Sequence, residues 1–261
     1  MSKHTTSRED SAAVAAEWSV PPESARAATL RAPLPARSVV WWTLLILLLV
    51  NAFFMLANVA HNMGDGTEEG ILGIFAPLAW EGDYDGSHIE IWGHIQLFAA
   101  AVVLAVLARA HRSALLGAWG FALFVVVVDD LFQVHEEAGE VLAESLGLQP
   151  ALGLRPEDFG ELLIWAVLGI MVLVPLVTAY LKADAWARKQ SWVMVGILAL
   201  LAVFAIGLDM LAIMLQGHVP GQVLRVVAWT ETLGEIVPMS LFLAFAVKLA
   251  VAPEGFRTRK A

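Results

Sequence analysis

The sequence predicts an all-α polytopic membrane protein, built as a six-transmembrane-helix bundle. The first observation is composition: 59% of the 261 residues are hydrophobic and the mean hydropathy is +0.70, far too apolar for a soluble domain. The second is a set of six apolar stretches, each long enough to cross a hydrocarbon layer of about 30 Å at about 1.5 Å per residue. We place the six helices at residues 39–60, 89–109, 114–137, 160–181, 191–215 and 225–250.

The remaining sequence is too short for a second domain, so we expect one membrane domain over residues 39–250. Residues 1–38 are polar and rich in Ala, Ser, Pro and Arg, which predicts a disordered cytoplasmic tail rather than a cleavable signal peptide. Residues 251–261 form a second short cytoplasmic tail. The chain contains no cysteine, which excludes thiolate metal sites, iron–sulfur clusters and cysteine nucleophiles.

The distribution of basic residues predicts the orientation of the bundle. When the loops between the six predicted spans are assigned to alternate sides of the membrane, every Lys and Arg except Arg155 and Arg225 falls on the side of the two termini. The positive-inside rule then places both termini in the cytoplasm, in a multi-pass protein of the inner (plasma) membrane. The bilayer is therefore the expected partner.

The acidic residues follow the opposite distribution. All but six of the 25 Asp and Glu residues fall in the outer half of the spans or in the outer loops. A strongly acidic outer face attracts cations and repels nucleic acid, which excludes nucleic-acid binding.

The connection between the first two predicted helices is long and acidic. Residues 81–87 resemble half of a calcium-binding loop, and the apolar stretch over residues 70–80 is long enough to lie across the outer end as a lid but too short to span. Both readings stay open. In the first helix, Asn51, Asn58 and Asn62 share one face, which is typical of interhelical hydrogen bonding in membranes.

The candidate functional residues are charged or titratable side chains within the outer halves of the spans. A charged side chain at the centre of a bilayer costs about 2.5–3.5 kcal/mol on insertion scales. When several such side chains lie at one depth, bound cations, shared protons or water must offset this cost. We select the following nine predicted site residues: Glu90, His94, Asp129, Asp130, Glu136, Glu161, Asp209, Glu231 and Glu235.

The strongest signal is the run of β-branched residues that leads into Asp129 and Asp130. On a continuous helix over 114–137, Asp129, Gln133 and Glu136 form one stripe, Asp130 lies about 100° away, and His135 points away from both. Helix capping does not explain two adjacent aspartates at that depth.

The other helices add carboxylates at helical spacing. Glu90 and His94, and likewise Glu231 and Glu235, are four residues apart and so share a face. Asp209 is a single acid in an otherwise apolar span, and two like charges at 231 and 235 repel unless a proton or cation lies between them.

Carboxylates with a histidine in a helix bundle are typical of sites for one or two metal ions. We assign Glu90, His94, Asp129, Glu136, Glu161, Asp209 and Glu231 as metal ligands, with Fe, Mn or Zn as the divalent metal. Asp130 and Glu235 are the predicted catalytic acid or base.

The segment from Asp129 to Glu136, with the acidic helix entry at Glu90 and the late pair Glu231 and Glu235, resembles uncharacterised bacterial multi-pass membrane proteins. These proteins carry Asp-Asp and His-Glu in one helix and a pair of glutamates in the last. The resemblance covers the helical core and implies a membrane bundle without implying an activity. Membrane hydrolases of the ceramidase kind are set aside, because too few histidines fall within the spans.

Three functions remain open from the sequence. The first is a membrane metalloenzyme, a hydrolase or oxidoreductase, that acts on a lipid or small apolar substrate. The second is a cation- or proton-coupled transporter or channel, although the acids stop near the midplane and no internal repeat is evident. The third is an accessory subunit of a membrane complex.

Overall fold

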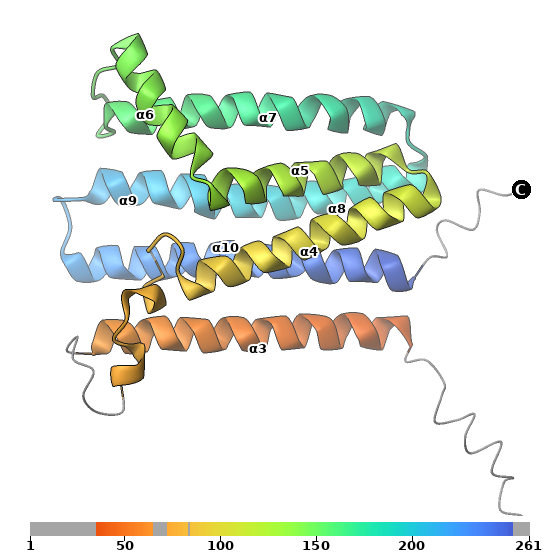
Figure 1. Ribbon diagram of the computed structural model, residues 1–261, viewed down its shortest axis with the longest axis horizontal. Helices are drawn as coiled ribbons and strands as arrows, with labels where there is room; N and C mark the ends of the chain where they lie inside the picture. The colour runs from red at the N-terminus through yellow and green to blue at the C-terminus, as the bar shows by residue number, and fades with distance from the viewer. Residues whose placement is uncertain (1–34, 65–71, 83, 253–261) are drawn as a thin grey trace, which may run out of the picture. The chain divides into compact units, whose positions relative to one another are not determined.

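The computed structural model describes residues 35–64, 72–82 and 84–252, and within these ranges the regular structure is helical (Figure 1). Six segments are long and apolar enough to cross a membrane: α3 (Ala36–Met63), α4 (His88–His111), α5 (Ala114–Leu131), α7 (Pro156–Lys182), the continuous stretch Ala185–Leu215 and α10 (Gly221–Val251). The predicted all-α six-helix bundle is confirmed. The predicted tails lie outside the described residues, apart from the few positions next to α3 and α10.

Three shorter elements complete the fold. Two 3-10 turns, η1 (Gly73–Phe75) and η2 (Leu78–Trp80), precede α4, and the helix α6 (Val134–Leu146) lies between α5 and α7. The fifth span consists of α8 (Ala185–Ala202), a π-helical stretch η3 (Val203–Leu208) and α9 (Asp209–Leu215). The π-helical stretch ends where Asp209 begins α9.

Successive spans run antiparallel, so the bundle has two chemically different ends. We call the end where α3 and α5 finish the acidic end, and the end where α4 finishes and α5 begins the basic end (left and right in Figure 1). Helix α10 is central and contacts α3, α4, α8, η3 and α9, whereas α5 contacts α4, α7 and α8. The predicted site residues come from α4, α5, α6, α7, α9 and α10.

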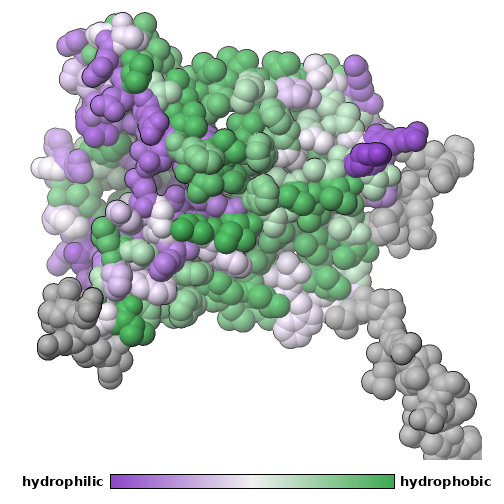
Figure 2. Space-filling view, viewed as in Figure 1, coloured by the Kyte–Doolittle hydropathy of each residue, from purple (hydrophilic) through white to green (hydrophobic). Residues whose placement is uncertain are grey.

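The outer helices expose apolar side chains along their lengths, as expected for contact with lipid. None of the apolar window of α7 is buried inside the bundle, and only a small part of that of α3 is. Figure 2 shows hydrophilic residues gathered at the acidic end and a hydrophobic surface along the helices. A surface of this kind is stable only next to hydrocarbon, which supports a multi-pass membrane protein.

Helices α4, α5, α8 and α10 enclose an apolar core that occupies mainly the basic half. Trp119 and Phe242 are each 1% exposed and pack against each other, with ring centroids 6.4 Å apart. Trp119 Nε1 donates to Ser191 Oγ at 2.8 Å, so the one polar atom of this large side chain is satisfied.

Near the middle of the bundle, a closed polar network joins α3, α4 and α10. Asn51 Nδ2 donates to Ser240 Oγ at 2.8 Å, Ser240 Oγ donates to Gln96 Oε1 at 2.6 Å, and Trp92 Nε1 donates to Asn51 Oδ1 at 2.9 Å. This is the interhelical role that the sequence predicted for Asn51. Satisfied buried networks fix helix register, since a slip would leave polar atoms without partners.

The predicted continuous helix over residues 114–137 is wrong. α5 ends at Leu131, Gln133 adopts a left-handed conformation with φ of 49°, and a new helix starts at Val134. Asp129 and Glu136 therefore do not share a helical stripe, and Asp129 lies in the last turn of α5 rather than two turns inside a longer helix.

Helix α6 folds back and packs closely on the start of α7. A Cβ at Gly160 would overlap the carbonyl oxygen of Gly139, and a Cβ at Gly139 would lie 2.6 Å from the backbone nitrogen of Glu161. The close approach of α6 and α7 is possible because both of these positions are glycines. The contact fixes α6, and with it His135, beside the first turns of α7.

Candidate metal centre

A cavity of about 690 Å³ opens at the acidic end of the bundle. Seven of the nine predicted site residues line it: Glu90, Asp130, Glu136, Glu161, Asp209, Glu231 and Glu235. The other two, His94 and Asp129, are buried directly behind its wall, and each contacts a residue that lines it. Helices separated by more than a hundred residues in the sequence thus bring these side chains to one place.

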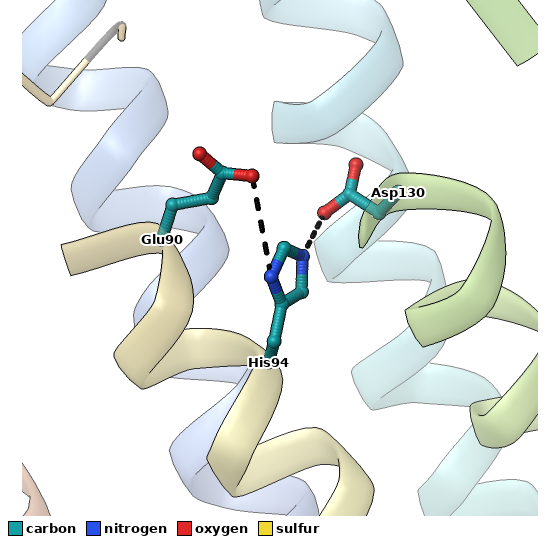
Figure 3. Close-up of side chains that lie close together, drawn as sticks. All are labelled: Glu90, His94 and Asp130. Atoms are coloured by element: carbon teal, nitrogen blue, oxygen red, sulfur yellow. Dashed lines mark hydrogen bonds and ion pairs between the residues drawn. The ribbon is translucent and has the colours of Figure 1, made fainter. Parts of the chain in front are cut away.

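His94 lies between two carboxylates from different directions (Figure 3). Its Nε2 is 2.5 Å from Asp130 Oδ2, across the interface of α4 and α5. Its Nδ1 is 4.0 Å from Glu90 Oε1, one helical turn away on α4. The side chain is only 5% exposed, so protein atoms set its orientation.

The bond to Asp130 assigns a role to each ring nitrogen. An ionised carboxylate only accepts hydrogen bonds, so the proton of a neutral imidazole lies on Nε2 and the lone pair on Nδ1. Nδ1 is buried and has no hydrogen-bond partner. A histidine that gives one N–H to a carboxylate and directs the other nitrogen at a second carboxylate has the arrangement of a metal ligand with its supporting group.

The spacing of the two free donors fits a first-row divalent ion. Metal bonds to histidine nitrogen and to carboxylate oxygen are each about 2.0–2.2 Å, so one ion touches both when the donors are up to about 4.2 Å apart. Nδ1 and Oε1 at 4.0 Å are too far apart for a hydrogen bond but within this limit. The other oxygen of Glu90 accepts from Gly86 N at 2.7 Å, which holds the carboxylate in place.

A second histidine forms a similar group with the neighbouring aspartate. His135 Nδ1 lies 3.1 Å from Asp129 Oδ2, and its Nε2 lies 3.7 Å from Glu136 Oε1. The sequence predicted that His135 points away from both stripes, which is wrong, because the break at Gln133 turns α6 and carries the ring back over α5. The ring also packs against Trp165 of α7, with centroids 5.0 Å apart.

The environment favours the protonated forms of His135 and Glu136 in the metal-free protein. Burial lowers the pKa of His135, but the hydrogen bond to Asp129 and the nearby carboxylate charges outweigh it and raise that pKa above 6.5. Burial raises the pKa of Glu136, and the charge of Asp85 adds to the effect.

The position of the aspartate pair explains why both need a partner. Asp129 and Asp130 lie in the last turn of α5, where the helix dipole is negative and disfavours a carboxylate. Adjacent helix residues point about 100° apart, so Asp130 reaches α4 and Asp129 reaches α6. Each aspartate is paired with one histidine, and this helix end becomes the link between the two groups.

Comparison with known proteins places the chain in a family. Residues 43–249 match the family described as a domain of unknown function, DUF8692. The chain belongs to the DUF8692 family. No curated protein and no solved structure matches it. The segment shared with the family includes all nine predicted site residues, from Glu90 to Glu235.

The remaining predicted ligands of this family member lie around the cavity without joining the group at His94. Among the described residues, the one group whose ligand atoms all lie within 4.8 Å of one another is Glu90, His94 and Asp130. Glu161 is close enough to interact electrostatically with His135 and Glu136, and Asp209 with His135. Glu235 interacts in the same way with Glu231, Asp130 and Glu90.

Arg155 and Arg225, the two basic residues predicted on the acidic side, both line the cavity. Arg155 makes two hydrogen bonds to Asp158 Oδ1, at 2.6 and 3.1 Å, and its backbone N–H donates to Oδ2 at 2.6 Å. Asp158 is fully buried and fully paired, so it is a helix-capping residue. In the sequence, these two arginines differ from the other basic residues because they alone fall on the acidic side of the bundle.

The described part of the connection before α4 packs against α3. Asp83 lies outside the described residues, and Asp85 accepts from Gln133 Nε2 at 2.8 Å. Within residues 72–82, Phe75 O accepts from the His61 ring at 2.7 Å and Glu81 accepts from Asn62 Nδ2 at 3.0 Å. These bonds hold the segment at one edge of the cavity.

Proposed function

We propose that this protein is a metal-dependent membrane enzyme that acts on a lipid or small apolar molecule. One observation carries the proposal: buried His94, with its proton directed to Asp130 and its free nitrogen 4.0 Å from Glu90, at the wall of a cavity large enough for a small molecule. A structural histidine would have both ring nitrogens hydrogen-bonded. We assign Fe, Mn or Zn to this position, with His94 and Glu90 as ligands and Asp130 as the group that orients the ring.

The walls of the cavity support a substrate with a polar and an apolar part. Carboxylates from α4, α5, α6, α7, α9 and α10 line the cavity, and apolar side chains such as Ile213, Leu224 and Met239 of α9 and α10 lie among them. The apolar part of a substrate would contact these side chains. A bound divalent metal supplies Lewis acidity and lowers the pKa of water in its coordination sphere.

The geometry assigns different roles to the two predicted catalytic residues. Asp130 is engaged by His94 and acts as a positioning residue rather than as an acid or base. Glu235 lines the cavity near Glu231, Asp130 and Glu90, and no hydrogen bond engages it in the described structure. Glu235 is therefore our candidate for moving a proton to or from the substrate.

The apolar core favours an enzyme over a conducting protein. Below the cavity, Leu97, Leu104, Trp119 and Phe242 fill the space between the helices toward the basic end, and each is at most 1% exposed. A proton or cation path would need polar side chains or water there. The transporter hypothesis would require a second conformation in which this core separates.

We propose the orientation in which both tails are cytoplasmic in the inner membrane and the cavity faces outward. A single cysteine introduced at exposed Ser145 should react with a membrane-impermeant thiol reagent added to intact cells, and one at Ala185 should not. The natural chain has no cysteine to interfere. Labelling of Ala185→Cys alone would show that the protein has the opposite orientation in the membrane.

The first test is the metal content of detergent-purified protein, measured by elemental mass spectrometry. Wild type should retain Fe, Mn or Zn, and His94→Ala should lose the ion of this site. His218→Ala is the matched control, because His218 is an exposed histidine at the same end whose ring hydrogen-bonds only the backbone of Gln216. Metal retained unchanged in His94→Ala would overturn the assignment.

The second test is turnover. The metal-loaded protein, reconstituted in liposomes of bacterial lipid extract, should form a lipid product detectable by mass spectrometry, and the product should disappear in Glu235→Gln and after chelation. Cation uptake by the same liposomes, lost in Asp209→Asn and without product formation, would instead establish a transporter.

A further inference from the structure

The two adjacent aspartates at the end of α5 hold two histidines in matching arrangements. Asp130 contacts Nε2 of His94, and Asp129 contacts Nδ1 of His135. In both groups the opposite ring nitrogen faces a glutamate, Glu90 in the first and Glu136 in the second. The two groups differ in which nitrogen faces the aspartate, but each presents one lone pair to a second carboxylate.

The distances in the second group also leave room for an ion. His135 Nε2 and Glu136 Oε1 are 3.7 Å apart, beyond hydrogen-bonding distance and within the span of about 4.2 Å that one first-row ion covers. Two bonds of about 2.1 Å would join these donors at an angle between tetrahedral and linear.

We propose that His135 and Glu136 hold a second divalent cation, so that the cavity contains a two-ion centre. This inference rests on the proposed function for the first ion. Asp129 is the orienting group of the second site, as Asp130 is of the first. Glu161, brought beside α6 by the Gly139–Gly160 contact, also lines the cavity and is close enough to interact electrostatically with both ligands.

Buried Asp129 supplies an independent observation. This side chain is 2% exposed, and its Oδ1 has no hydrogen-bond partner, so within the described part of the chain His135 is the one group that pairs with this buried carboxylate. A charge buried with so little compensation is costly. A cation on the far side of the imidazole would compensate it through the ring, as in carboxylate–histidine–metal groups.

A second ion changes what the centre can do. It would add a second Lewis acid at the wall of the same cavity, because His135 and Glu136 both line it.

The test counts bound ions by titrating the metal-free, full-length protein with Mn²⁺ and following free Mn²⁺ by electron paramagnetic resonance. Wild type should bind two equivalents, and His135→Ala and His94→Ala one each. Glu136→Gln should weaken one equivalent, whereas the neighbouring Glu137→Gln, an exposed residue that does not line the cavity, should change neither. Glu136→Gln also keeps the test decisive if His135→Ala does not fold.

A crossed pair of variants separates the two sites further. Loss of an orienting carboxylate weakens metal binding about 10–100-fold, so Asp129→Asn should weaken one equivalent and Asp130→Asn the other. One equivalent in wild type, lost in His94→Ala and kept in His135→Ala, would overturn the second site and leave the proposed function intact. No equivalent in wild type would overturn both.

Discussion

The two halves of the bundle differ in what fills the space between the helices. In the basic half, α4, α5, α8 and α10 meet through close apolar contacts, and buried polar atoms such as Trp119 Nε1 are paired. In the acidic half, α4, α5, α6, α7, η3, α9 and α10 surround a cavity lined by carboxylates. The basic half gains stability from close packing. In the acidic half, the carboxylates repel one another unless protons or cations lie between them.

The comparison teaches where stability and function reside. A side chain removed from the basic half leaves a void that the neighbours cannot fill, whereas a charge removed from the acidic half removes repulsion. The halves should therefore respond differently to substitution, to glycine replacement and to pH.

The largest effect should come from Trp119→Ala. The substitution leaves a cavity against Phe242 and removes the donor to Ser191, and we expect a loss of about 3–5 kcal/mol in unfolding free energy. Thermal unfolding in detergent, followed by circular dichroism, measures it. Phe121→Ala on the same helix is the control, because Phe121 is 42% exposed on the lipid side and should change stability much less. Equal losses in the two variants would contradict a core confined to the bundle interior.

An intermediate effect should follow Gly160→Ala. The added Cβ overlaps the carbonyl of Gly139, so α6 must move away from α7 at a cost of roughly 1–3 kcal/mol. A cysteine introduced at Ala143, which is 4% exposed on α6, should then react faster with a maleimide. Gly169→Ala is the matched control on α7, since a Cβ there meets no atom within 4 Å. An unchanged labelling rate would show that α6 is not held by the glycine contact.

The smallest effect should be a pH dependence from His135 in metal-free protein. Its raised pKa means that the folded state binds the proton more tightly than the unfolded state. The resulting stabilisation is fully present below pH 6.5 and is lost as the pH rises through the folded-state pKa. His135→Gln should abolish this part of the pH profile of the melting temperature, and His218→Gln should leave it. A profile that is the same in His135→Gln as in wild type would place the titration elsewhere.

The fold class and the position of the acids were accessible from the sequence because both depend on local composition. Six apolar stretches of span length leave few alternatives, and the observed helices exceed most predicted ones by a few residues at polar caps. Ser87, for example, accepts from Glu90 N, and Asp184 accepts from Ala187 N. The gathering of carboxylates near one cavity followed from their common depth.

The arrangement within the site was not accessible, for a specific physical reason. The chain turns at Gln133, a residue type that gives no strong turn signal, and every angular argument beyond Leu131 depended on a continuous helix. His135 was consequently placed on the wrong side, and its bond to Asp129 was missed. The polar composition of residues 134–146 was the available signal, because a helix this charged does not extend a membrane span.

The π-helical stretch η3 gives the fifth span a property that no single side chain encodes. A π-helical turn accommodates one residue more than an α-helical turn, so such stretches behave as one-residue insertions that the helix absorbs without ending. The ring of Phe204 in η3 packs against Gly234, where a Cβ would overlap it. Deleting one residue between Val203 and Leu208 would therefore convert this stretch into a regular α-helix and leave Asp209 facing the cavity. The fifth span can thus change in length by one residue without moving the carboxylate that it brings to the cavity.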